Sequence, residues 1–120
     1  MQFNDILGIE SMLRGCVVFK FECSEDSEMY AGSPQFGDAL NALLDSIIAY
    51  YRDLGRHDTA DKWEATYLLS PTSNKADFVR SYVVKHPKWR AMNMQERKEW
   101  VNIVAAPYRI RDSEFSQFLD

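Results

Sequence analysis

The sequence predicts an α+β fold, a single compact domain over residues 1–120 in which helices dominate, with four or five helices and a small antiparallel sheet. Two patterns lead to this prediction: a strong amphipathic helix in the middle of the chain and an alternating apolar segment nearer its start. A length of 120 residues suits one domain, since domains of about 100 to 150 residues are the commonest. Hydrophobic residues make up 46% of the chain and charged residues 27%, which provides a core and excludes disordered chains.

The strongest predicted helix covers about residues 35–54. Its apolar side chains recur at helical spacing and comprise Phe36, Leu40, Leu43, Leu44, Ile47, Tyr51 and Leu54. Ser33 can cap this helix, Pro34 suits its first position, and Gly55 ends it. Because the apolar face is wider than a single seam, we expect this helix to be central and to have neighbours on more than one side.

The best predicted strand covers residues 16–23. Two sets of side chains alternate there, Val17, Phe19, Phe21 and Cys23 against Val18, Lys20 and Glu22. A period of two in β-branched and aromatic residues is typical of a half-buried strand, and such a strand needs a partner for its backbone groups. The first choice of partner is residues 108–111, whose arginines would share a face with Glu22, and the second choice is residues 29–31.

Further helices are expected on both sides of these elements, over residues 5–14, about 59–69, 75–85 and 93–107, with a last turn from residue 112 or 113. Gly15 is interpreted as the end of the first of them. Asn93 and Glu96 resemble a capping box, and Pro87 closes the helix before it. Residues 82–84 also fit a strand.

Composition and termini favour a soluble, cytoplasmic protein. No apolar run reaches the roughly 18 residues of a membrane span, and residues 1–5 lack the basic residue that starts a signal peptide. Cys16 and Cys23 lie at opposite ends of the predicted strand, roughly 23 Å apart at about 3.3 Å per residue. A disulfide needs Cα atoms within about 7 Å, so we expect two free thiols.

Charge is distributed unevenly along the chain. The formal net charge is −4, with four basic and ten acidic residues in positions 1–60 and ten basic and eight acidic residues in positions 61–120. The densest acidic set is Glu22, Glu25, Asp26 and Glu28. The basic set is Lys75, Arg80, Lys85, Lys88, Arg90, Arg97 and Lys98. An acidic total disfavours general nucleic-acid binding, which depends on a basic face.

No pattern in the sequence supports catalysis or metal binding. His57, Asp61 and Glu64 could share a helical face and are metal-ligand types, but His57 precedes the expected helix start, so a solvated face is the better interpretation. Acidic neighbours of Cys23 oppose a thiolate, and both cysteines are better explained by packing. Phosphate-loop, GxSxG and HExxH motifs are absent. We therefore expect a protein that is not an enzyme and holds no metal and no cofactor.

The run Lys85-His86-Pro87-Lys88-Trp89-Arg90 interleaves basic residues with an aromatic one. Such a mixture suits nucleic acid, through phosphate contacts and base stacking on Trp89, and it also suits an anchor in a protein interface. The structural alternative is that Trp89 fills the gap between two helices while Lys88 and Arg90 stay solvated.

The predicted function is that of a small, acidic, non-catalytic protein-binding factor of the inhibitor or immunity type. The residues predicted to bind its partner are Glu22, Glu25, Asp26, Glu28, Lys85, Lys88, Trp89 and Arg90. The acidic members would speed encounter with a basic surface on another protein. The alternative is a small nucleic-acid-associated regulator that uses the basic segment 75–98. No membrane partner is expected.

Overall fold

Helices form the architecture in the computed structural model, which describes residues 5–22 and 29–119. The elements are α1 (Ile6–Glu22), α3 (Pro34–Asp53), α4 (His57–Thr66), α5 (Asn74–Val83), α6 (Met94–Ala105) and the short 3-10 helices η1 (Trp89–Ala91) and η2 (Asp112–Phe118). Within these two described ranges the backbone forms no strand, and its one β-bridge joins Leu68 to Arg109. The predicted α+β fold with a small sheet is therefore wrong, because the described chain is all-α.

The segment predicted as the best strand, residues 16–23, is helical as far as the structure describes it. α1 continues through Gly15 and ends at Glu22, whereas Cys23 lies outside the described residues. One face of α1 is buried along its length and consists of Glu10, Leu13, Val17, Lys20 and Phe21. This helical spacing, of three and four residues, matches a buried helix face, and the packing outweighs the strand preference of the β-branched and aromatic side chains.

Neither segment predicted to pair with that strand does so. Residues 108–111 pair elsewhere, through Arg109: its backbone N–H donates to the Tyr67 carbonyl at 2.7 Å, and its carbonyl accepts from the Leu69 N–H at 2.8 Å. Residues 29–31 are helical. The extended backbone that the sequence indicated around Arg109 therefore exists, but it forms a single bridge.

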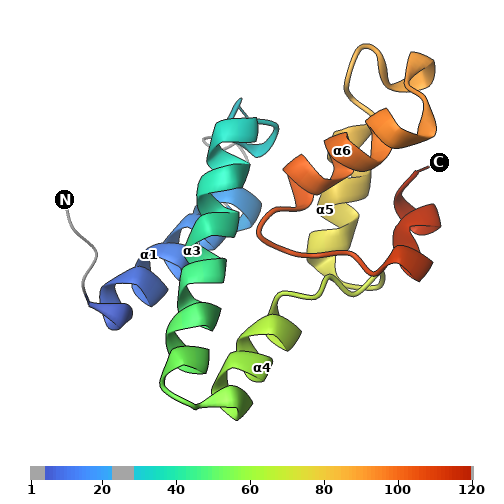
Figure 1. The fold of residues 1–120 in the computed structure, drawn as a ribbon. Helices are drawn as coiled ribbons and strands as arrows, with labels where there is room; N and C mark the ends of the chain where they lie inside the picture. The colour runs from blue at the N-terminus through green and yellow to red at the C-terminus, as the bar shows by residue number, and fades with distance from the viewer. Residues whose placement is uncertain (1–4, 23–28, 120) are drawn as a thin grey trace.

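α3 is the central helix, as its broad apolar face predicted. It contacts α1, α4 and α6, and Figure 1 shows it as the longest helix, with α4 returning beside its C-terminal end. Ser33 caps it by accepting a hydrogen bond from the Phe36 N–H at 3.2 Å. Gly55, with a φ of 74°, follows its end and takes the left-handed conformation that glycine favours. The predicted bounds and both end signals are confirmed.

The backbones of α3 and α6 approach each other closely at Gly37. A Cβ atom at this position would lie 3.3 Å from the carbonyl oxygen of Ile103 and 3.5 Å from the Cβ atom of Ala106. Lys20 of α1 reaches the same end of α6, where its Nζ donates to the carbonyls of Ile103 at 3.0 Å and Ala106 at 2.7 Å. The buried ammonium group thus binds carbonyl oxygens that the end of a helix leaves without an intrahelical partner.

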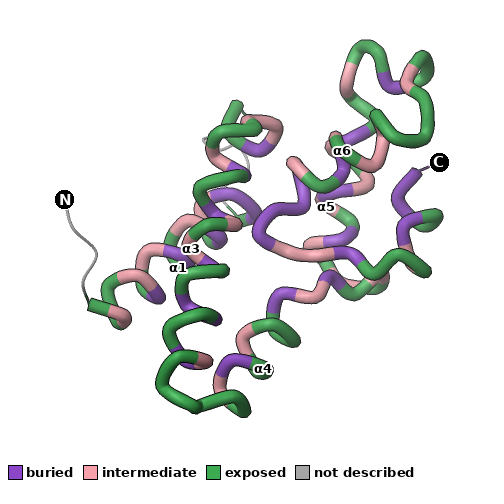
Figure 2. The backbone as a smooth tube through the Cα atoms, in the orientation of Figure 1, coloured by how far each residue is buried: buried purple, intermediate pink, exposed green. Residues whose placement is uncertain are grey.

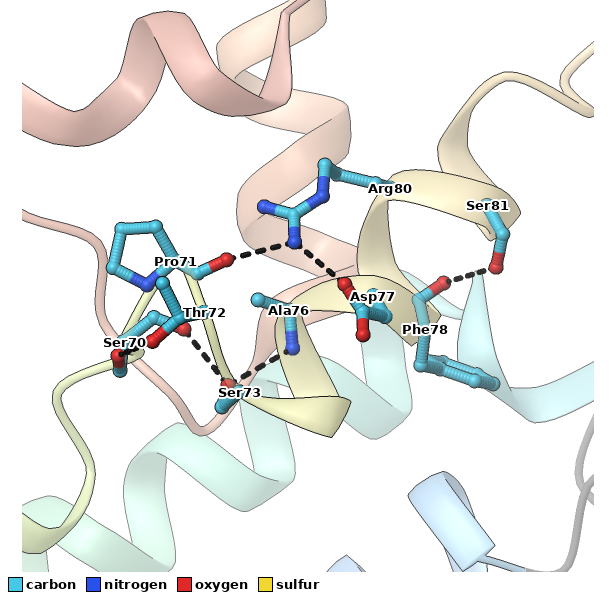
Figure 3. Close-up of polar contacts among 9 residues, drawn as sticks. All are labelled: Ser70, Pro71, Thr72, Ser73, Ala76, Asp77, Phe78, Arg80 and Ser81. Carbon is cyan, nitrogen blue, oxygen red and sulfur yellow. Dashed lines mark hydrogen bonds and ion pairs between the residues drawn. The ribbon is translucent and has the colours of Figure 1, made fainter.

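α5 begins with a network of short-range polar contacts (Figure 3). Ser73 accepts a hydrogen bond from the Ala76 N–H at 3.1 Å and so satisfies one of the free donors at the helix start. Arg80, two turns later, donates to the carbonyl of Pro71 and to the carboxylate of Asp77, both at 2.7 Å. These bonds tie the turn before α5 to its first two turns.

The predicted capping box at the start of α6 is confirmed. The Asn93 side chain accepts from the Glu96 N–H at 2.9 Å, and the Glu96 carboxylate accepts from the Asn93 N–H at 3.1 Å. α5 and α6 contact each other and lie side by side in Figure 1. Cys16 is a free, half-buried thiol, as expected. None of the helices in the described ranges is long and apolar enough to cross a membrane.

Candidate functional site

Of the four residues of the predicted acidic surface, the structure describes only the first, Glu22. Glu22 is exposed and ends α1, while Glu25, Asp26 and Glu28 lie outside the described residues. Burial raises the pKa of Tyr108 to about 12, and the nearby Glu22 charge contributes in the same direction. The contact of the other three carboxylates with a partner stays a prediction.

The predicted basic residues lie on an exposed connection between α5 and α6, which we call the basic loop (residues 84–92). Figure 2 shows that most of this loop is exposed, and the side chains of Lys85, Lys88 and Arg90 all belong to its exposed part. Over the described part of the chain, none of these three cations forms an ion pair. The loop therefore presents three positive charges that no carboxylate of the described structure neutralises.

Trp89, the aromatic residue of the predicted run, is only 6% exposed. The guanidinium of Arg97 lies 4.7 Å from the centre of its ring, and Arg97 also donates to the carbonyls of Trp89 at 3.2 Å and Leu119 at 2.9 Å. Trp89 thus fills the gap between loop and helices, as the structural alternative proposed. In this conformation its ring has little surface for a base or a partner.

A small hollow opens beside the basic loop, with a volume of about 210 Å³. We call it the aromatic hollow. The residues that line it are Tyr82, Lys85, His86, Pro87 and Trp100. The ring centres of His86 and Trp100 lie 4.9 Å apart in an edge-on contact, and those of Tyr82 and Trp100 lie 6.2 Å apart. The ammonium of Lys85 lies 6.0 Å from the Tyr82 ring, so a cation lies at the edge of an aromatic surface.

Hydrogen bonds hold the hollow in shape. The indole N–H of Trp100 donates to the carbonyl of Val83 at 3.1 Å, which joins α6 to the last residue of α5. The Lys88 N–H donates to Nδ1 of His86 at 3.0 Å and fixes the imidazole against the loop. A Cβ atom on Gly32 would lie 2.6 Å from the Trp100 ring, so only glycine lets the chain pass this ring without displacing it.

The sequence pattern identified the basic loop but not the accessible aromatic residues beside it. Tyr82 of α5 and Trp100 of α6 lie outside the predicted run of residues 85–90, and both are only half-buried. Val101 and Val104 are fully buried and define the centre of the inner face of α6. Trp100 lies at the border of that face. This position can be read from the sequence, and it indicates that one side of the Trp100 ring is accessible.

The possible metal ligands His57, Asp61 and Glu64 are used differently. Arg52 of α3 donates to the carboxylates of Asp61 at 3.0 Å and Glu64 at 2.8 Å. Both bonds raise the pKa of the guanidinium, and the bond to Glu64 has the larger effect. His57 is the exposed first residue of α4. Among the residues that the structure describes, no three His, Cys, Asp or Glu side chains gather as metal ligands would.

Other buried ionisable groups make contacts between helices. The Tyr51 hydroxyl donates to the buried Glu10 carboxylate at 2.9 Å. Burial is the main cause of the raised pKa of Tyr51, and this hydrogen bond is the second cause. Burial also raises the pKa of the Cys16 thiol, which opposes formation of a nucleophilic thiolate. Burial lowers the pKa of Lys20 to about 7. Each of these groups lies within the helix packing rather than in the aromatic hollow.

Comparison with known proteins finds no relative of the chain. No family model, no curated protein and no solved structure matches it. The chemistry of the basic loop and the aromatic hollow is therefore the basis for a functional proposal.

Proposed function

We propose that this protein is a non-catalytic binding factor whose basic loop and aromatic hollow bind an acidic segment of another protein. The observation that supports this best is a cluster of three exposed, unneutralised cations beside a hollow walled by Tyr82, His86 and Trp100. Trp, Tyr and Arg are enriched among the residues that dominate the binding energy of protein interfaces. The basic loop and the aromatic hollow together bring Arg90, Tyr82 and Trp100 to one concave region of the surface.

The size of the hollow favours one inserted side chain over a free metabolite. Its volume of about 210 Å³ is smaller than the roughly 300 to 1,000 Å³ typical of small-molecule sites. An apolar side chain against Trp100 and His86 would remove apolar surface from water on both partners, at about 25 cal/mol for each Å². We therefore expect the bound segment to carry one large apolar residue flanked by Asp or Glu.

The charge on the basic loop selects for an acidic partner. Lys85, Lys88 and Arg90 lie on one short loop, and charges act together within a screening length of about 8 Å at physiological ionic strength. Such a patch raises the association rate of acidic segments and disfavours basic ones. Nucleic acid is the weaker alternative, because Arg97 covers the Trp89 ring that base stacking would use and the net charge is −4.

Three further features stay predictions from the sequence. The acidic residues Glu22, Glu25, Asp26 and Glu28 would form a second contact surface, for a basic partner, in an inhibitor or immunity-type role. A cytoplasmic location is favoured by the free thiol of Cys16, since reducing compartments keep thiols unpaired. Absence of catalysis is the third.

The test is a selection from random displayed peptides of about 12 residues against the full chain, followed by measurement of the Kd of the enriched peptide. We expect enriched sequences with Asp or Glu around one large apolar residue. Changing Lys85→Glu and Lys88→Glu together should weaken binding by at least about tenfold. The matched control, Lys62→Glu with Arg111→Glu, has the same net charge on other exposed surfaces and should stay within about twofold of the wild type.

Two results would contradict the proposal. Equal weakening by both double variants would mean that total charge, and not the basic loop, determines binding. A single-stranded oligonucleotide that binds more tightly than any selected peptide, and loses affinity steeply between about 50 mM and about 200 mM salt, would support the nucleic-acid alternative instead.

A further inference from the structure

A second and larger cleft lies between α3, α6 and the chain that follows α6. Its volume is about 480 Å³, within the range of small-molecule sites. The side chains with polar groups that line it are Asn41, Asp45, Asn102, Tyr108, Arg109 and Asp112. It shares no lining residue with the aromatic hollow, so it is a separate candidate site.

One wall of this cleft is held in place by Arg109. The backbone of Arg109 bonds to Tyr67 and Leu69, and its guanidinium forms an ion pair with Asp45 on α3. These contacts join the segment after α6 to the central helix. A wall that is already ordered needs little further ordering when a ligand arrives, which favours binding.

Two amide side chains from different helices add unused hydrogen-bonding groups. Asn41 lies one turn before Asp45 on α3, and Asn102 lies in the last turn of α6. Among the described residues, neither amide has a hydrogen-bond partner, and the same holds for the carboxylate of Asp112. Each amide can donate twice and also accept, so the cleft offers both kinds of hydrogen-bonding group.

The charge balance of the cleft disfavours charged ligands. Asp45 neutralises Arg109, so no free cation lines the cleft to bind a phosphate or a carboxylate. Positive charges already flank two of its aromatic residues: Lys75 lies 5.7 Å from the ring of Tyr108, and Lys98 lies 5.5 Å from the ring of Phe115. Among the residues that line the cleft, Asp112 alone carries an unpaired charge, and because this carboxylate is exposed, an ion pair with a cationic ligand would contribute little.

The geometry points to a binding site for a neutral, polyhydroxylated ligand of the saccharide class. Each sugar hydroxyl donates and accepts at once, which matches the amides of Asn41 and Asn102 and the carboxylate of Asp112. Tyr108, which is half-buried, lines the same cleft and adds aromatic surface for the C–H face of a sugar ring. An uncharged ligand also leaves the ion pair between Asp45 and Arg109 intact.

Saturation-transfer NMR on the full chain tests this assignment, with maltotriose and chitotriose as neutral probes and spermidine and inorganic phosphate as charged ones. We expect transfer to the ring protons of at least one sugar. Asn41→Ala and Asn102→Ala should each reduce it by at least about fivefold, since each removes hydrogen bonds to the ligand. Asn74→Ala, at the exposed start of α5, is the matched control and should leave it unchanged.

The test separates this site from the basic loop. Transfer to the sugar should persist in the Lys85→Glu and Lys88→Glu double variant, whether or not that variant binds acidic peptides. Absence of transfer to both sugars, transfer that survives both asparagine variants, or preferential binding of spermidine or phosphate would overturn the saccharide assignment.

Discussion

Two glycines in the helices predict opposite effects of the same substitution. A Cβ atom on Gly15 of α1 meets nothing within 4 Å, so Gly15→Ala should raise the free energy of unfolding by about 0.5 to 1 kcal/mol through its better helix propensity. A Cβ atom on Gly37 would lie 3.3 Å from the Ile103 carbonyl oxygen, so Gly37→Ala should lose this gain and destabilise the fold. Urea denaturation of both variants measures the difference. Equal stabilisation would show that α3 and α6 do not meet at Gly37.

Lys20 predicts an unusual dependence of stability on pH. Its pKa is lowered by burial from 10.5 to about 7, so between these values the unfolded chain holds a proton that the folded chain has released. The free energy of unfolding should therefore rise with pH above about 7, by up to about 1.4 kcal/mol for each pH unit. Below about pH 7 the ammonium is charged in both states, and Lys20 adds no further slope.

Comparison with Lys20→Met isolates this contribution. Denaturation between about pH 7 and about pH 8.5 avoids Tyr51, Tyr67 and Tyr108, whose pKa values burial raises, and any contribution of Cys16 cancels between the two proteins. The variant should lose the rise with pH, whatever its stability at one pH. Parallel stability curves for wild type and variant would mean that Lys20 is not buried in contact with the end of α6.

At the level of single elements, α3 should carry more stability than any other helix, because α1, α4 and α6 all pack against it. Leu44 is fully buried, and Leu44→Ala should cost about 2 to 5 kcal/mol through lost transfer energy and a cavity. Leu43 is half-buried on the same helix, and Leu43→Ala should cost clearly less. Thermal and urea unfolding of the pair check the order. A cost for Leu43→Ala equal to or above that for Leu44→Ala would contradict the orientation of α3.

The helices that the sequence predicted well are those with local end signals. Ser33 and Gly55 bound α3, and the capping box of Asn93 and Glu96 starts α6, and each of these acts through nearby backbone groups. Such signals depend on a few neighbouring residues, so they can be recognised without the tertiary structure.

The second half of α1 could not be predicted in the same way. Residues 16–22 fit a strand by alternation and a helix by spacing, and a short apolar run does not decide between the two. Gly15 was interpreted as a helix end, although it lies inside α1 on an exposed face. The deciding contacts are remote in sequence: Lys20 bonds to Ile103 and Ala106, and such contacts leave no local pattern.

For the whole molecule, the sequence predicted the charge of the candidate surface better than its shape. Lys85, Lys88 and Arg90 are exposed on one loop, as expected from their polarity. The aromatic hollow beside these cations depends on Trp100, which reaches the loop only because α6 packs against α5. The absence of a sheet from the described residues follows from the same long-range packing, since α1 becomes part of the helix layer around α3.

The most direct test of the proposed binding surface is the indole N–H signals of the three tryptophans in a ¹⁵N spectrum, recorded while the selected acidic peptide is added. The indole of Trp100 donates to the Val83 carbonyl beside the hollow, so its signal should shift as the peptide saturates the site. Trp63 lies on α4, does not line the hollow and should stay in place as an internal reference. An unchanged Trp100 signal at saturation, or an equal shift of the Trp63 signal, would contradict the assignment of the aromatic hollow as the partner site.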